Sequence, residues 1–219
     1  MLTSSRLHFI FFRVCFFLPA LFFLTHAEAQ TNYRTQFRHL SCPEKWWVIF
    51  HPFIAKKAYR LTQEARLAAK EMAHDTVLDG DANGGQVDAF RHAYWMALLA
   101  QNICWRKALR LGKAHEKGNY LQFKKGETEE GVLPDSASGA MDLFNNRIGI
   151  GIGRMRKKIP EEELKAAVRD SILSGKMLVI RKNKNGDSED CKGNILNPEN
   201  YQRQWNIPKC LVRSDIKRE

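Results

Sequence analysis

The segment most informative about the fold is Asp88-Ala-Phe-Arg91-His92-Ala-Tyr-Trp95. It belongs to a run from about residue 86 to 102 with almost no polar face, which is typical of a helix inside a domain. Asp88 and His92 are four residues apart, so they share one face of that helix. A buried polar group without a partner costs about 2–7 kcal/mol. We therefore expect other segments to supply partners for this carboxylate and imidazole.

Two further helix-patterned segments carry polar residues of the same kind, Ala114-His115-Glu116 and Met141-Asp142-Leu-Phe-Asn145-Asn146. Asp142 shares a helix face with both asparagines, which follow it by three and four positions. His115 and Glu116 are neighbours, so their side chains diverge by about 100°. We expect His115 to face the other two segments and Glu116 to lie at the edge. The sequence thus predicts one polar site built by three helices.

The apolar spacing predicts a mainly α protein of about five helices with a small C-terminal β hairpin. Pro43 opens a short additional helix that Pro52 interrupts. The five helices are expected at about 53–74, 86–102, 105–117, 138–149 and 160–175. Glycines and charges over residues 118–139 predict a long loop, of the kind that often forms a lid. Residues 176–181 are β-like, and Asn185-Gly186 is a hairpin turn signal.

Residues 1–29 have the features of a secretory signal peptide: two arginines, an apolar run over 14–24 and the cleavage site Ala27-Glu28-Ala29. The apolar run is shorter than the roughly 20 residues that span a bilayer, so no stable transmembrane segment is expected after cleavage. The remaining chain is interpreted as a helical domain over 30–175, with its motif core at about 75–155, and a β-hairpin tail over 176–219. We expect a periplasmic, envelope-associated or secreted protein.

Four cysteines follow the cleavage site, and an even number in an exported chain indicates disulfides. Of the three possible pairings, we favour Cys191–Cys210 in the tail together with Cys42–Cys104. The formal net charge is +11, and the signal peptide accounts for only one unit of it. A basic chain favours anionic partners, namely an envelope polymer, a phospholipid or another phosphoester. No nuclease motif supports nucleic acid as the partner.

The three motifs, DAFRHAYW at 88–95, AHE at 114–116 and MDLFNN at 141–146, resemble those of an uncharacterised bacterial domain family of unknown function. The family occurs in small exported proteins and in the C-terminal parts of large toxin-like surface proteins. The resemblance covers about residues 75–155. It implies a helical domain with a shared polar site, and it specifies no reaction.

Two hydrolase mechanisms fit these residues. In the first, His92, His115 and Asp142, with Asp88 or Glu116 as a further ligand, bind a divalent metal such as zinc and leave an open position for water. In the second, Asp88 orients His92 as a general base without a metal. Taken together, the candidate catalytic residues are Asp88, Arg91, His92, His115 and Asp142, and the candidate substrate-binding residues are Trp95, Glu116, Asn145 and Asn146. The alternatives are a non-enzymatic envelope protein that binds an anionic polymer, and a purely structural polar network.

Two other features have open interpretations. The segment Asp79-Gly-Asp81-Ala-Asn83-Gly84 matches the first half of a calcium loop, but position 12 is Phe90 instead of glutamate. We favour a glycine-rich turn whose Asp or Asn caps the next helix. Trp46-Trp47 is a candidate for an exposed contact with a membrane or a glycan.

Overall fold

The computed structural model describes residues 33–128, 131–156 and 158–217. The chain divides into two compact units, Met1–Leu40 and Ser41–Glu219. In the first unit, residues 33–39 are helical. The expected signal peptide, residues 1–29, lies outside the described residues. None of the described helices has the length and apolar character that crossing a membrane requires.

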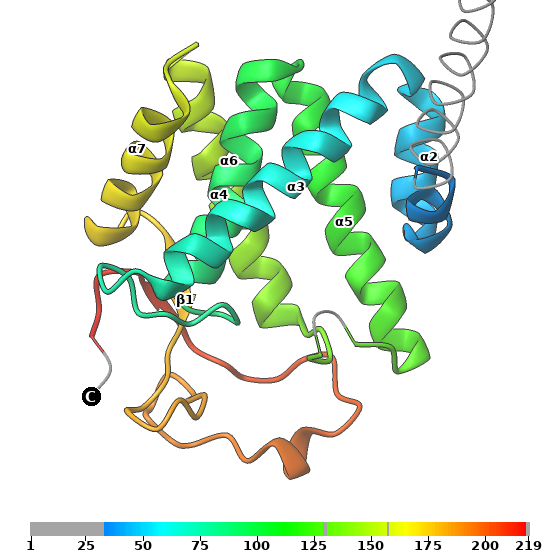
Figure 1. Ribbon diagram of the computed structural model, residues 1–219. Helices are drawn as coiled ribbons and strands as arrows, with labels where there is room; N and C mark the ends of the chain where they lie inside the picture. The colour runs from blue at the N-terminus through cyan, green and yellow to red at the C-terminus, as the bar shows by residue number, and fades with distance from the viewer. Residues whose placement is uncertain (1–32, 129–130, 157, 218–219) are drawn as a thin grey trace, which may run out of the picture. The chain divides into compact units, whose positions relative to one another are not determined.

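The second unit is mainly helical, as predicted, and ends in a small two-stranded antiparallel sheet (Figure 1). Its β1 pairs with β2, and a 3-10 helix, η1, lies between these strands in the sequence. The elements in order are α2 (Cys42–Phe50), α3 (Pro52–His74), α4 (Gln86–Asn102), α5 (Trp105–Lys125), α6 (Ser136–Met155), α7 (Glu161–Leu173), β1 (Leu178–Ile180), η1 (Pro198–Tyr201) and β2 (Leu211–Arg213). The predicted helix at 86–102 is confirmed to the residue.

Helix α4 is the centre of this unit, in contact with α3, α5, α6, α7 and β1 (Figure 1). Its large side chains Phe90, Tyr94 and Met96 are completely buried. Full burial of such a side chain contributes about 1.5–3 kcal/mol. The polar residues of this helix are therefore held inside the core, where they must be matched by neighbouring elements.

Helices α4 and α6 approach closely because α6 presents glycines to α4. A Cβ atom at Gly149 would overlap the backbone of Ala93, and one at Gly153 would overlap that of Ala97. The prediction that a helix ends at Gly149 is wrong, since α6 continues to Met155. These glycines are contact points within the helix, and the short interhelical distance brings Asp142 on α6 near α4.

The predicted loop over 118–139 is also wrong in its first part, because α5 extends to Lys125. Gly118 lies inside the helix, where a Cβ atom would overlap the side chain of Ser41. The helix ends at Gly126, which adopts φ 71°, a left-handed conformation that favours glycine. The connection to α6 is therefore residues 126–135, and the expected lid over 118–125 is packed helix.

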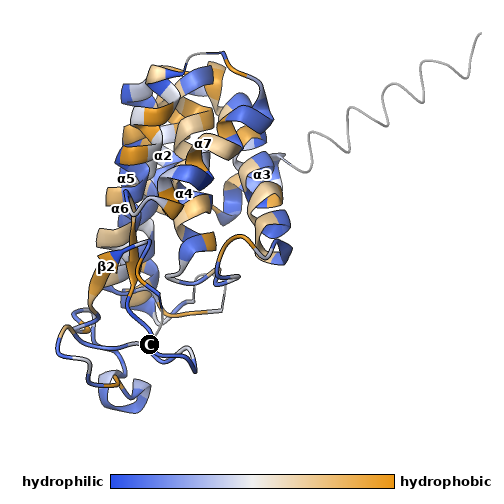
Figure 2. Ribbon diagram, turned by 90° about the vertical axis from the view of Figure 1, so that its left-hand side faces the viewer, coloured by the Kyte–Doolittle hydropathy of each residue, from blue (hydrophilic) through white to orange (hydrophobic). Residues whose placement is uncertain are grey.

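The C-terminal segment is fastened by the predicted Cys191–Cys210 disulfide. Between β1 and β2 the chain makes a long excursion that is coloured mostly hydrophilic in Figure 2. The turn at Asn185-Gly186 lies within this excursion, where the Gly186 N–H donates to the Asn183 carbonyl oxygen. The partner of β1 is β2, in the register Val179 to Val212.

The predicted Cys42–Cys104 bridge is wrong, since both cysteines are free and exposed. Helix α2 runs antiparallel to α5: Trp47 Nε1 donates to the Lys107 carbonyl oxygen, and Ser41 packs at Gly118. Cys42 therefore lies near position 118 of α5, about 21 Å along the helix from Cys104 at 1.5 Å per residue. A disulfide requires Cα atoms within about 7 Å.

Candidate functional site

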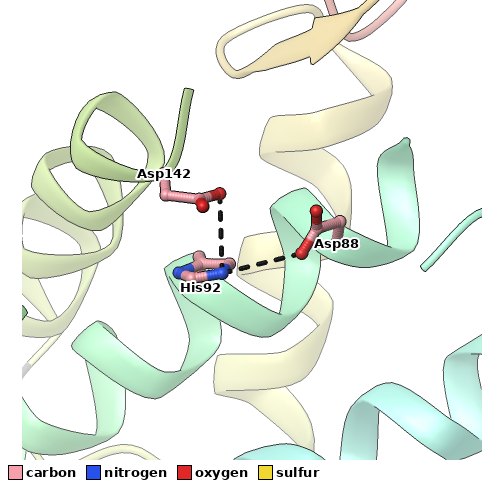
Figure 3. A group of neighbouring side chains, drawn as sticks. All are labelled: Asp88, His92 and Asp142. Atoms are coloured by element: carbon pink, nitrogen blue, oxygen red, sulfur yellow. Dashed lines mark ion pairs between the residues drawn. The ribbon is translucent and has the colours of Figure 1, made fainter. Parts of the chain in front are cut away.

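Three buried side chains from two helices converge, two of them, His92 and Asp142, from the predicted metal set, with Asp88 in place of His115. Asp88 and His92 project from α4, and Asp142 projects toward them from α6 (Figure 3). His92 Nε2 lies 3.6 Å from Asp88 Oδ1 and 3.5 Å from Asp142 Oδ1. One ligand atom from each residue falls within 4.8 Å of the others. The arrangement is a one-histidine, two-carboxylate set that suits a divalent cation.

Asp88 is oriented from two directions. Its Oδ2 accepts a hydrogen bond of 2.7 Å from the Gly84 N–H, and its Oδ1 is 2.6 Å from Arg91 Nη2. Gly84 has φ 81°, and a Cβ atom there would come within 2.6 Å of the Ile180 side chain. The Gly84 carbonyl oxygen in turn accepts from the Ile180 N–H at 2.7 Å. The glycine-rich turn and β1 together position the carboxylate.

The same turn agrees with the capping interpretation only in part, because Asp79 bonds the start of α4 whereas the N-cap residue, Gly85, supplies no side-chain hydrogen bond. Asp79 accepts hydrogen bonds from the N–H of Gln86, the first residue of α4. The ammonium of Lys182 donates to Asp81 Oδ2 and to the Asn83 carbonyl oxygen, both at 2.6 Å. A lysine from the C-terminal segment therefore supplies the positive charge that binds these oxygens.

The pKa of His92 is lowered well below its usual 6.5, first by burial and then by the charges of Arg91 and His115. The Asn146 amide acts in the opposite direction, although its geometry falls short of a normal hydrogen bond. His92 is therefore neutral near pH 7. The neutral imidazole is the form that binds a metal ion or accepts a proton.

The side chain of Arg91 connects this buried group to the surface. Its Nη2 lies 3.2 Å from His92 Nε2 as well as close to Asp88, and the side chain is 20% exposed. Asp88 and Asp142 are 7% and 9% exposed at their side chains. Arg91 is thus more exposed than either carboxylate that it accompanies.

His115 lies beside the group, with its ring 6.2 Å from that of His92 and 5.5 Å from that of Trp95. Its Nδ1 is 3.0 Å from Glu44 Oε1, a partner that sequence reasoning missed. Burial raises the pKa of Glu44, but the hydrogen bond and charge of His115, with hydrogen bonds from Ser41, bring it down to about 2. His115 is therefore oriented by an ionised carboxylate, and it is not among the three residues that could share one ion.

A local signal for Glu44 was present in the sequence. Ser41-Cys-Pro-Glu44 is a capping box, the Ser-x-x-Glu pattern that starts a helix. Glu44 Oε2 accepts hydrogen bonds from the Ser41 N–H at 2.9 Å and from its hydroxyl at 2.7 Å. The box predicts the start of α2, whereas the contact with His115 spans 71 positions and has no local signature.

The structure places the remaining predicted residues as follows. Trp95 Nε1 donates to the Thr62 hydroxyl at 2.9 Å, so this indole links α4 to α3 beside His115. Glu116 is buried, and its Oε2 accepts from the Asn119 amide at 3.3 Å.

Both amide atoms of Asn145 bind the backbone of Leu178, which fixes β1 to α6. Asn145 therefore has a structural role here, and Asn146 is the asparagine beside His92.

Comparison with known protein families identifies the following match. A family model described as a domain of unknown function, DUF6973, matches residues 45–176. No curated protein and no solved structure matches the chain. The matched region contains all three motifs and ends before β1, so the residues that converge on His92 lie inside it.

Proposed function

Because the chain belongs to a family described as a domain of unknown function, DUF6973, we propose an activity from its own residues: a hydrolase with a divalent-metal centre at Asp88, His92 and Asp142. The observation that supports the proposal most strongly is the convergence of these three ligand atoms within 4.8 Å. Three protein ligands leave a coordination position open, which is the pattern of catalytic metal sites.

The charges of the group favour a cation. Two carboxylates carry two negative charges when ionised, Arg91 supplies one positive charge to Asp88, and His92 is neutral. Burying two carboxylates side by side is costly, and a divalent ion held between them would reverse the local charge balance. A first-row ion such as Zn²⁺, held by these residues, would give the centre a net positive charge that favours an anionic substrate.

The residues around the centre supply the rest of a hydrolytic mechanism. Asp88, His92 and Asp142 would hold the ion, which would supply Lewis-acid activation of water at neutral pH. Arg91, at the partly exposed edge, is placed to stabilise negative charge on a phosphoryl oxygen. His115, oriented by Glu44, is the residue best placed to move a proton to the leaving group.

The proposed substrate class is an anionic envelope component that contains a phosphoester, such as a phospholipid or a wall or envelope polymer. The net charge of +11 favours such a substrate over a neutral one. Export, proposed from residues 1–29, agrees with the Cys191–Cys210 disulfide, because disulfides persist in oxidising compartments.

The test is metal-dependent hydrolysis. Protein stripped with a chelator is assayed on a chromogenic phosphodiester and on phosphatidylglycerol, with Zn²⁺, Mn²⁺ or Mg²⁺ restored separately. We expect Asp142→Asn to lose about 100-fold or more of the activity, because the ion loses a ligand. Asp170→Asn, at an exposed position on α7, is the matched control and should keep full activity.

Two results would refute the proposal. One is an absence of metal-dependent hydrolysis on both substrates, and the other is full activity in Asp142→Asn. If Asp142→Asn does not fold, as judged by circular dichroism, His92→Gln replaces it, because a glutamine of similar size retains hydrogen-bonding atoms. A folded, fully stable wild type that binds envelope polymer without cleaving it would identify a binding protein instead.

A further inference from the structure

One face of helix α2 packs against the protein, and the other face is exposed and apolar. Glu44 and Trp47 point inward, where Glu44 binds His115 and the Trp47 indole binds α5. Trp46, Ile49 and Phe50 lie on the other side, since they are displaced from Glu44 by about 140–240° around the helix. Their exposed fractions are 54%, 52% and 72%. An amphipathic helix normally buries its apolar face, and here that face is outward.

The apolar face continues onto the start of α3. Phe53, the second residue of that helix, is 99% exposed. The rings of Trp46 and Phe50 are stacked with their centroids 5.7 Å apart, so they form one surface. Single exposed apolar residues are normal, but four large ones within eight positions form a patch of the kind that marks an interaction site. We call Trp46, Ile49, Phe50 and Phe53 the aromatic patch.

Basic residues surround the aromatic patch. Lys56 and Arg60 are exposed on α3, and Lys57 is partly exposed between them. Each of the three lies within about 60° of Phe53 around that helix. Lys45 precedes Trp46 on α2, and residues 45–63 contain no aspartate or glutamate. The surface therefore combines an apolar centre with a positively charged border.

We propose that the aromatic patch and its basic border dock the protein onto an anionic lipid bilayer. Tryptophan and phenylalanine partition into the boundary between headgroups and acyl chains, while lysine and arginine bind the anionic headgroups. Each basic residue near such a surface contributes to the attraction, which salt screens. Charge complementarity favours an anionic bilayer over a purely apolar protein partner. Such a protein partner would not explain why four basic residues border the patch or why residues 45–63 contain no acid.

Docking in this orientation also has a consequence for the site. Glu44, on the opposite face of α2, holds His115 beside the His92 group. The helix that contacts the lipid is thus the helix that orients a residue of the proposed centre. Membrane binding itself does not depend on the chemistry at Asp88, His92 and Asp142.

The experiment is co-sedimentation with vesicles, using a chain that begins at Gln30, so that the apolar run of 14–24 cannot insert. The core lies in the unit Ser41–Glu219 and is unaffected by this change. Vesicles of phosphatidylcholine with about one third phosphatidylglycerol are compared with pure phosphatidylcholine. We expect at least tenfold tighter binding to the anionic vesicles, weakened by high salt. The triple variant Trp46→Ser, Phe50→Ser and Phe53→Ser should bind at least tenfold more weakly.

A matched control removes three exposed apolar side chains elsewhere, through Met155→Ser, Ile195→Ser and Ile216→Ser. This control should bind like the wild type. Equal binding by the aromatic-patch variant, or equal binding to neutral and anionic vesicles, would overturn the proposal. So would a wild-type dimer that ignores vesicles and becomes monomeric in the aromatic-patch variant, since the occupant would then be a second copy of the chain.

Failure here is distinguishable from failure of the proposed hydrolase. The variant His92→Gln should bind anionic vesicles as the wild type does, whatever its effect on hydrolysis. The aromatic-patch variant should still hydrolyse a soluble chromogenic phosphodiester if the metal centre exists. Vesicle binding therefore tests the membrane proposal, and hydrolysis of the soluble substrate tests the metal centre independently.

Discussion

The contact between Glu44 and His115 allows a quantitative prediction. Glu44→Gln removes one negative charge and keeps the size of the side chain. Folding lowers the pKa of Glu44 from 4.5 to about 2. This difference in pKa corresponds to about 3 kcal/mol, since one pKa unit is worth about 1.4 kcal/mol. Its side chain is 16% exposed, so we expect little loss of this contribution to solvent screening.

The sign of the pH dependence follows from the direction of the shift. A carboxyl group with a lowered pKa stabilises the fold fully above its unfolded pKa of 4.5, and it loses this contribution as the pH falls toward 2. The difference in unfolding free energy between wild type and Glu44→Gln should be about 3 kcal/mol near pH 7 and about half that near pH 3. Near pH 7 this corresponds to a melting temperature lower by about 6–12 °C.

Urea unfolding of both proteins over this pH range provides the measurement. Glu199→Gln, an exposed glutamate in η1, is the control and should change stability by less than about 0.5 kcal/mol. A double-mutant cycle with His115→Asn separates the contribution of the histidine from that of the Ser41 capping box. A difference below about 0.5 kcal/mol near pH 7, or one that does not change with pH, would refute the reasoning.

Three further predictions concern the frame of the site. Gly84→Ala should lower the free energy of unfolding by about 2–3 kcal/mol in denaturant, because a Cβ atom would meet Ile180 and the residue has a positive φ. Gly131→Ala is the control: it also has a positive φ but has open space around it, so it should lose only about 1 kcal/mol. Asp135→Ala should lose about 3 kcal/mol in thermal or urea unfolding, because it removes the α6 cap and leaves a partly buried lysine unpaired. Iodoacetamide should label both Cys42 and Cys104 in the native protein, and Cys104 readily, because backbone N–H groups lower the pKa of its thiol. Mass spectrometry that shows either cysteine protected in a disulfide would contradict the structure.

Local patterns predicted the fold class well. The bounds of α4, the start of α5 at Trp105 and the Cys191–Cys210 bridge follow from apolar periodicity, helix signals and cysteine spacing. Glycine was the main source of error. Gly118 and Gly149 were interpreted as helix breakers in the sequence, yet each lies inside a helix where a neighbouring segment leaves no room for a Cβ atom. Periodicity within one segment contains no information about the distance to another helix.

Only part of the candidate site could be predicted, because a pattern within one segment does not show which other segments contact it. Asp88, His92 and Asp142 are polar residues on apolar helices, so burial alone indicates that they need one another. Glu44 could not be predicted because its partner, His115, is distant in sequence. Gly84 could not be predicted because its hydrogen bond to Asp88 depends on the backbone conformation of the turn. The wrong Cys42–Cys104 pairing has a related cause, since only the antiparallel packing of α2 on α5 shows that the two thiols are far apart.

Metal stoichiometry tests the central claim most directly. Zn²⁺ or Mn²⁺ is titrated into chelator-treated protein by calorimetry, and the bound ion is then counted by elemental analysis. We predict one ion per chain for the wild type, with affinity lowered about 10- to 100-fold or more in Asp142→Asn and unchanged in Asp170→Asn. A folded wild type that takes up no ion, or one that binds equally well after Asp142→Asn, would show that the buried carboxylates and imidazole are not a metal centre.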